Sequence, residues 1–105
     1  MGTLRLENEG REFPLNRSRM IIGRRPEVDI VLSDPAVSGR HTLIISILDD
    51  SFVENLSDTN GTFINGNRTD KTVLQEGDVI TVGKRKLVYH ADKNSPGIDE
   101  EVFEK

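Results

Sequence analysis

The sequence predicts an all-β fold of the sandwich or barrel class, and three observations lead to this prediction. No stretch of useful length repeats apolar residues with the period of an amphipathic helix. Short apolar runs are instead separated by turn-forming residues about every eight to twelve positions, as is typical of antiparallel sheets. Asn-Gly, the strongest short signal for a hairpin turn because both residues tolerate a positive φ, occurs at Asn60-Gly61 and at Asn65-Gly66.

The apolar runs give the expected strands in chain order. Thr3–Leu6 alternates apolar and polar residues, and a turn at Asn8–Gly10 leads into a returning strand at 11–15. Pro14 lacks an N–H group, which restricts that second strand to a sheet edge or a strand end. Further strands are expected at 19–23, 29–32, 41–48, 52–56, 62–64, 71–74, 79–83 and 86–90. Together with the hairpin partners, this predicts roughly ten or eleven strands.

The segments between these runs contain turn residues. Turns are expected at Asp34-Pro35, at Asp49–Ser51 and at Gln75–Asp78. The Asn65-Gly66 pair fits an ordinary hairpin. The Asn60-Gly61 pair follows Ser57, Asp58 and Thr59, a run of small polar residues that a single turn does not require. This loop therefore has a composition that suggests a binding role.

Length and charge bound the organisation of the chain. With 105 residues we expect one domain, at 1–91, followed by an acidic flexible tail or linker at 92–105. The net charge is −4, and the tail, with five acidic residues and two lysines, holds most of it. A nearly neutral body argues against a broad nucleic-acid surface but allows a small local anion site.

Several classes of protein are disfavoured by composition. There is no apolar run of about 18 residues and no secretory signal, so we expect neither a membrane span nor membrane binding. The chain has no cysteine, which fits a reducing compartment and a cytoplasmic protein. His41 and His90 are too few for a histidine-based metal site, and no metal or other cofactor is expected.

Three polar loops contain hydrogen-bond donors suited to a phosphate group. The first follows a strand with Gly23-Arg24-Arg25, the second is 34–41 with Ser38 and Gly39, and the third is 56–61. Loops gather at the two ends of a sandwich, so these three can meet at one end. Arginine presents a planar fork to phosphate oxygens, and hydroxyl and backbone N–H groups complete such a site.

The order of these motifs resembles the forkhead-associated (FHA) domain family. The residues that carry the resemblance are "GRRPEVDIVLSDPAVSGRHTLI", then "ENLSDTNGTFING", then "LQEGDVITVG", within about residues 3–91. The resemblance implies an eleven-stranded β-sandwich of two twisted sheets, similar also to SMAD-type folds. It implies a module without enzymatic activity that binds a phosphothreonine-containing protein or peptide through loops at one end. It further implies a signalling role within a larger protein or a kinase-linked system.

The resemblance also implies roles for individual residues. Arg24 is expected to contact the phosphate, Ser38 to donate its hydroxyl to it with the Gly39 backbone nearby, and Thr59 to help hold it. Asn60 is expected to bond the peptide main chain. Expected scaffold positions are Gly23, His41, Gly61 and Asn65. Possible additional contacts are Arg25, Arg40, Ser57 and Asp58.

One position departs from the family pattern. Some members carry a basic or amide side chain directly after the motif serine, where it adds a phosphate contact, and this chain has Gly39 there. The site either lacks one donor, or Arg25 or Arg40 replaces it. A charge-assisted hydrogen bond contributes about 1.5–3 kcal/mol, so this difference affects the expected affinity about tenfold or more.

Two alternative functions remain open at this point. A phosphorylation-independent scaffold with the same fold would bind its partner through another face. An esterase would use Ser38 and His41 with Asp34 or Asp29 as a triad, but the chain has no G-x-S-x-G elbow and no α/β pattern. We therefore expect no catalytic residues.

Overall fold

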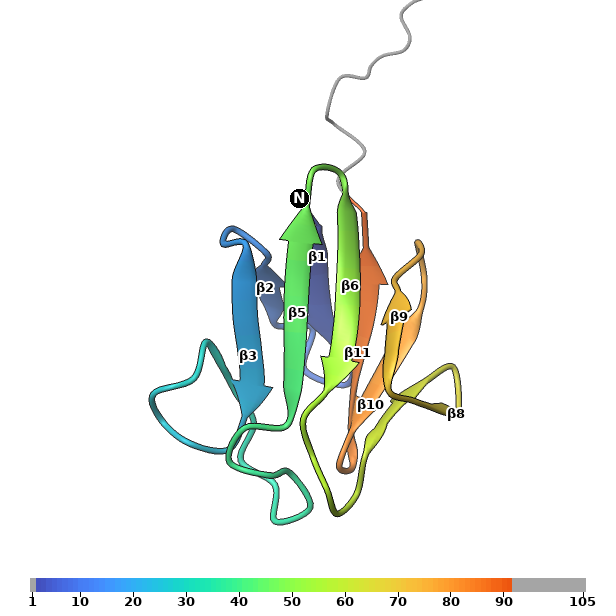
Figure 1. Cartoon of the computed structure of the whole chain (residues 1–105). Coiled ribbons are helices and arrows are strands. Elements are labelled where there is room, and N and C mark those ends of the chain that lie inside the picture. The colour runs from blue at the N-terminus through green and yellow to red at the C-terminus, as the bar shows by residue number, and fades with distance from the viewer. Residues whose placement is uncertain (1, 92–105) are drawn as a thin grey trace, which may run out of the picture.

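The computed structural model describes residues 2–91, which form eleven strands in two sheets without a helix (Figure 1). The strands of the six-stranded sheet, in spatial order, are β2 (Glu12–Pro14), β1 (Thr3–Leu6), β11 (Arg85–His90), β10 (Val79–Val82), β7 (Thr62–Ile64) and β8 (Asn67–Thr69). The strands of the five-stranded sheet are β4 (Ile30–Val31), β3 (Arg19–Gly23), β5 (Thr42–Ile47), β6 (Asp50–Asn55) and β9 (Lys71–Val73). The predicted all-β sandwich is confirmed. The predicted tail at 92–105 lies outside the described residues.

The core lies between the two sheets and follows from the alternation of side chains along each strand. In β1, Leu4 and Leu6 are buried while Arg5 is exposed. In β3 the same pattern buries Met20 and Ile22. Together with the buried aliphatic residues of β5, β6, β10 and β11 they form one cluster. Each fully buried Leu or Ile side chain contributes about 1.5–3 kcal/mol, so this cluster fixes which face of each strand points inward.

The structure corrects several expected boundaries. The turn between β5 and β6 lies at Leu48 and Asp49, where Leu48 has a φ of 55°, so Asp50 and Ser51 belong to β6 and not to the turn. Strand β4 begins at Ile30 and not at Asp29. The Asp29 carboxylate accepts the Ile21 N–H group of β3, where a paired strand would supply a backbone carbonyl. Strand β8 is the partner of β7 in the hairpin predicted at Asn65-Gly66, but the sequence did not indicate its bounds, because Asn67–Thr69 has little apolar character.

All three polar loops lie at one end of the sandwich, which is the lower end in Figure 1. They connect β3 to β4, β4 to β5 and β6 to β7. The β10–β11 turn lies at this end as well, whereas the β5–β6 turn lies at the opposite end (Figure 1). Within residues 2–91 no helix has the length and hydrophobicity that crossing a membrane requires.

Candidate functional site

The β3–β4 loop is joined to the β4–β5 loop by backbone contacts. Gly23 ends β3 and is buried against Gly39, and a Cβ atom built on Gly23 would lie only 2.0 Å from the Gly39 carbonyl oxygen. Beyond this contact, Arg24 N–H donates to the Ser38 carbonyl at 3.0 Å and Arg25 N–H donates to the Gly39 carbonyl at 3.3 Å. Because their backbones are fixed in this way, the exposed side chains of Arg24 and Arg25 start from defined positions beside the second loop.

His41 joins the second loop to the third. Its ring is fully buried, and Nδ1 accepts the Ser38 backbone N–H at 3.0 Å. Nε2 lies 2.7 Å from the Gly61 carbonyl oxygen. A carbonyl can only accept, so Nε2 bears the hydrogen and the ring is the neutral Nε2–H tautomer. Both nitrogens are thus bonded to backbone groups, one in the second loop and one in the third.

Ser57 organises the hydroxyl groups of the site. It is buried, and its Oγ accepts the backbone N–H groups of Thr59 at 3.3 Å and Asn60 at 3.4 Å. Its Oγ also lies 2.8 Å from Ser38 Oγ. A hydroxyl has two acceptor positions and one hydrogen, so with both positions used Ser57 donates to Ser38. The hydrogen of Ser38 then remains available for another acceptor.

A buried polar chain supports the third loop from beneath. Asn55 Oδ1 accepts the Ser57 N–H at 3.1 Å and the Thr62 hydroxyl at 2.9 Å. Thr42 Oγ1, on β5 of the other sheet, lies 2.8 Å from Thr62 Oγ1. Since the Thr62 hydrogen is given to Asn55, Thr42 is the donor in this pair. The chain connects the two sheets directly below the loops and keeps every hydroxyl in it satisfied.

Asp34 fixes the outer part of the second loop. Its carboxylate is buried and accepts the backbone N–H groups of Ala36 at 2.8 Å and of Lys84, in the β10–β11 turn, at 3.1 Å. The hydrogen bond from Ala36 and, more weakly, that from Lys84 hold the pKa of Asp34 below its ordinary value, against the opposing effect of burial. Next to it, Asn60 Nδ2 donates to the Ala36 carbonyl at 2.7 Å and so joins the third loop to the second.

The lowered pKa of Asp34 predicts a pH dependence of stability. A carboxyl group with a lower pKa in the folded state stabilises the fold above its unfolded pKa, about 3.9, and this contribution is lost as pH falls through the folded pKa. We expect Asp34→Asn to lower the free energy of unfolding at pH 6, and we expect its deficit relative to wild type to shrink at pH 3. Denaturant unfolding at both pH values measures this. Asp58→Asn, at an exposed position, is the control, and an Asp34→Asn deficit that is equal at both pH values would contradict the assignment.

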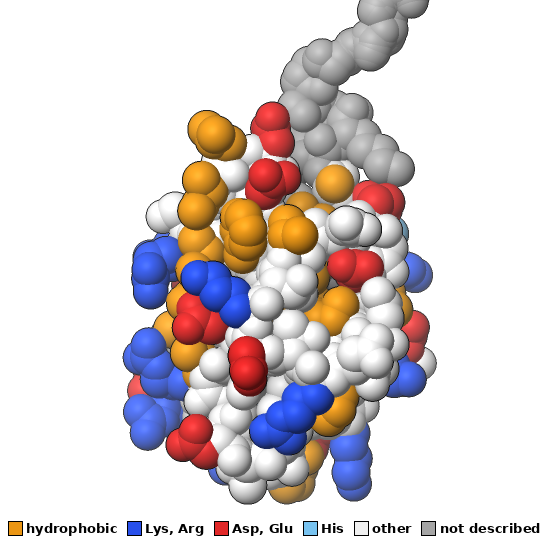
Figure 2. All heavy atoms as spheres, turned by 45° about the vertical axis from the view of Figure 1, so that its right-hand side comes forward, with side chains coloured by type: hydrophobic (Ala, Val, Ile, Leu, Met, Phe, Trp, Pro, Cys, Tyr) orange, Lys and Arg blue, Asp and Glu red, His pale blue; other side chains and the backbone are white. Residues whose placement is uncertain are grey.

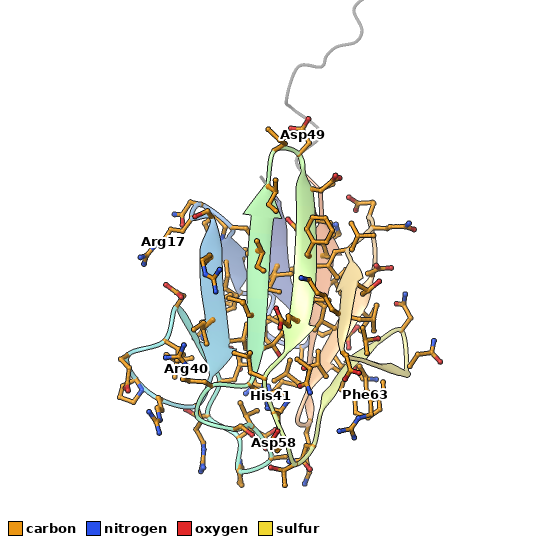
Figure 3. All side chains as sticks on the ribbon, viewed as in Figure 1. Arg17, Arg40, His41, Asp49, Asp58 and Phe63 are labelled. Atoms are coloured by element: carbon orange, nitrogen blue, oxygen red, sulfur yellow. The ribbon has the colours of Figure 1, made fainter. Side chains whose placement is uncertain are left out.

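The structure brings most of the predicted site residues together at the loop end. Figure 3 shows Arg40, His41 and Asp58 there, with Arg40 and Asp58 exposed. Thr59 and Asn60 are exposed as well. Asn65 lies apart, at the far end of β7, where its side chain bonds Asp78 and the Val79 N–H group. Asn65 therefore supports the β7–β8 turn and does not line the loops.

A shallow, open depression lies beside the second loop. It encloses about 440 Å³ and is lined by Arg24, Arg25, Pro26 and Gly39. A Cβ atom on Gly39 would lie 2.8 Å from Arg25 Nε and 3.0 Å from Arg25 Cγ. The Arg25 side chain thus occupies the space that a side chain at position 39 would need. Within residues 2–91 the backbone N–H groups of Gly39 and Arg40 donate to no protein acceptor.

The arrangement is suited to binding an anion and not to nucleophilic catalysis. Arg24 and Arg25 line one depression with Gly39, and the neighbouring residues add the Ser38 hydroxyl and the two backbone N–H groups. A triad would need His41 to accept from the Ser38 hydroxyl and to donate to a carboxylate. His41 is bonded to two backbone groups instead, and Asp29 and Asp34 are bonded elsewhere. In the described part of the chain no three potential metal ligands cluster.

Sequence reasoning missed the residues that act from below the site. Asn55 and Thr42 lie inside the predicted strands 52–56 and 41–48, where the sequence indicates no further role for them. Asp34 was expected in a turn and was weighed as a triad member, and its long-range bond to Lys84 leaves no mark in the local sequence. Arg68 on β8 also approaches the third loop, with its guanidinium close to Gly61.

Comparison with known proteins places these observations in a family. A family model described as FHA domain matches residues 20–83. The oxoglutarate dehydrogenase inhibitor of Corynebacterium efficiens is 38% identical over 84 residues, which is 80% of this chain and 59% of that protein. The glycogen accumulation regulator GarA of Mycobacterium tuberculosis is 35% identical over 82 residues, which is 78% of this chain and 51% of that protein. The chain therefore spans only a little over half the length of these relatives.

Solved structures agree with the sequence comparison. A structure from a study of phosphothreonine-dependent FHA domain interactions has a TM-score of 0.83 and 32% identity, and the match covers 87% of this chain and 96% of that one. The FHA domain of FhaA, complexed with the intracellular domain of another protein, has a TM-score of 0.82 and 32% identity over 86% of this chain and 100% of that one.

Proposed function

Because this chain belongs to the FHA domain family, we propose that it is a phosphothreonine-binding module without catalytic activity, which brings a phosphorylated protein to another component. The observation that carries this proposal is the Ser38 hydroxyl, whose hydrogen is left available by the buried Ser57 beside the exposed Arg24. A phosphate placed there meets charged, hydroxyl and backbone donors together. We assign it to the cytoplasm and to a kinase-linked system, since a kinase must supply the ligand.

The residue roles follow from this placement. Arg24 and the Ser38 hydroxyl bind phosphate oxygens, and the N–H groups of Gly39 and Arg40 add backbone donors, as in other anion-binding nests. Thr59 lies exposed on the opposite loop, and Asn60 is in place to bond the main chain of the peptide. Ser57 and His41 act by positioning the loops, because both are buried.

Arg25 supplies the contact that Gly39 lacks. Its side chain crosses Gly39 and lines the same depression as Arg24, so its guanidinium reaches the position where other family members place a side chain after the motif serine. Its partner Glu27 is 3.9 Å away and both side chains are more than half exposed, so this ion pair is too weak to hold Arg25 away from a phosphate.

We expect Arg25→Ala to weaken phosphopeptide binding about tenfold, the loss of one charge-assisted hydrogen bond. Fluorescence polarisation with a labelled phosphothreonine peptide measures the dissociation constant. In a Gly39→Arg background the inserted side chain supplies the phosphate contact. There, Arg25→Ala should weaken phosphopeptide binding clearly less than it does in the wild-type background. An equal loss in both backgrounds would show that Arg25 does not compensate for Gly39.

The test of the function itself is binding to an oriented library of phosphothreonine peptides at fixed salt concentration. Matched phosphoserine and unphosphorylated libraries are the controls. Selective binding of the phosphothreonine set supports the proposal and gives the flanking preference. Equal or absent binding across all three sets contradicts it.

One surface favours a second candidate function, that of a scaffold whose binding does not depend on phosphorylation. Ile47, Leu48 and Val73 are 55%, 90% and 38% exposed. Figure 2 shows hydrophobic side chains gathered near the end of the molecule opposite the loops. A partner bound there would be retained after phosphatase treatment and after Arg24→Ala, which separates this function from the first.

A further inference from the structure

Arg68 lies beside the third loop but takes no part in the network described above. Arg68 pairs with Phe63 across the β7–β8 ladder. Gly61 directly precedes β7 and lies two positions before Phe63, so a long side chain at 68 can reach it diagonally across the ladder. A Cβ atom on Gly61 would lie 2.9 Å from Arg68 Cζ and 3.1 Å from Nη1. The guanidinium therefore rests against the glycine, in space that any other residue at 61 would fill.

The guanidinium of Arg68 lies beside Gly61, and no opposite charge contacts it within residues 2–91. Within residues 2–91 Arg68 takes part in no ion pair and no side-chain hydrogen bond, and the residue is exposed. Arginine stays charged at any ordinary pH and presents five N–H donors. A positive charge thus lies beside the third loop, and no ion pair within residues 2–91 neutralises it.

Arg68 lies on the other side of the binding loops from the arginine pair at the phosphate site. Arg24 and Arg25 stand on the β3–β4 loop next to Gly39, whereas Arg68 stands next to Gly61. Asn60, assigned above to the peptide main chain, directly precedes Gly61. Figure 3 places Phe63, the cross-strand neighbour of Arg68, in the lower half of the molecule, to the right of His41. A peptide held by Asn60 passes close to Arg68, since an extended chain advances about 3.3 Å per residue.

On this basis, and resting on the proposed phosphothreonine site, we propose that Arg68 is a specificity-determining residue. It pairs with an anionic side chain, a carboxylate or a second phosphate, within about three residues of the phosphothreonine. Because Arg68 is exposed, its planar fork can donate two parallel hydrogen bonds to either anion. The module then selects acidic or doubly phosphorylated sequences over neutral ones carrying the same phosphothreonine.

The experiment uses one phosphothreonine peptide varied singly at the three positions on either side. Each position carries alanine, aspartate, phosphoserine or lysine in turn, and binding is measured by fluorescence polarisation to wild type, Arg68→Gln and Arg68→Glu. Lys86→Gln is the control, because Lys86 is exposed on β11 of the same sheet and its loss changes the net charge equally. Unfolding curves confirm that each variant is folded.

At one position we expect the peptide with aspartate to bind the wild-type protein about threefold more tightly than the peptide with alanine. The peptide with phosphoserine at that position should show a larger factor. Arg68→Gln should abolish the preference for an acidic residue, and Lys86→Gln should retain it. Arg68→Glu should instead prefer the peptide with lysine at that position. A preference for phosphoserine without one for aspartate identifies the second phosphate as the ligand. Binding without any acidic preference, or a preference that survives Arg68→Gln, overturns the role of Arg68 and leaves phosphothreonine binding intact. Failure of every peptide to bind wild type overturns the proposed function instead.

Discussion

Arg24→Ala is expected to weaken binding of a phosphothreonine peptide by roughly 100-fold. The guanidinium contributes a charged fork, and each hydrogen bond to a charged group contributes about 1.5–3 kcal/mol, so loss of the fork removes about 3 kcal/mol or more. The side chain is exposed, and within residues 2–91 it forms no ion pair or side-chain hydrogen bond. The substitution should therefore leave the fold unchanged. Isothermal titration calorimetry measures the affinity, and denaturant unfolding monitored by circular dichroism measures the stability.

Two further variants make the Arg24 result specific. Arg5→Ala removes an equal charge from β1, on the outer face of the six-stranded sheet, and should bind as wild type does. Arg24→Lys keeps the charge but loses the planar fork, so its affinity should fall between those of wild type and Arg24→Ala. Binding by Arg24→Ala at wild-type affinity would show that the phosphate lies elsewhere.

Local signals predicted the all-β class and most of the strands, whereas the eleven-stranded sandwich of two sheets was implied by the resemblance to the FHA family. The alternation of apolar and polar residues in Thr3–Leu6 and the short apolar run in Arg19–Gly23 predicted strands with the bounds that the structure shows. Boundaries were less predictable where a side chain serves a tertiary contact. The strand predicted at 41–48 begins with His41. In the structure the His41 ring is bonded to the neighbouring loops, and β5 begins at Thr42.

The site was predictable only in part, for a related physical reason. Residues directly in the three loops, such as Ser38 and Asn60, stand out because small polar residues and glycine are concentrated there. The residues that support these loops from below do not stand out in the sequence. Their hydrogen bonds, between Lys84 and Asp34 and between Thr42 and Thr62, join residues far apart along the chain. The position of Arg25 across Gly39 likewise depends on how two loops meet, which local patterns do not specify.

Gly23→Ala is expected to cost the most stability of the substitutions considered. The added Cβ atom would lie 2.0 Å from the Gly39 carbonyl oxygen and 3.1 Å from the Arg40 Cα, and both of these are backbone atoms. No rotamer change relieves such a clash, so β3 and the second loop must separate. Overpacking typically costs about 1–3 kcal/mol, and we expect about 3 kcal/mol or more here because neither backbone is free to move. Denaturant unfolding measures the change.

Gly39→Ala is the matched control, because it adds the same methyl group on the other side of the same contact. Its Cβ atom would meet the side chain of Arg25, which is exposed and can turn away. The free energy of unfolding should therefore change by less than about 1 kcal/mol. Phosphopeptide affinity separates the two variants further. Gly39→Ala displaces only Arg25 and should weaken binding modestly, whereas Gly23→Ala breaks the contact that sets the backbone of Arg24 against Ser38 and should abolish binding even where the protein remains folded. Equal stability losses for the two variants would mean that the Gly23–Gly39 contact does not hold these loops together.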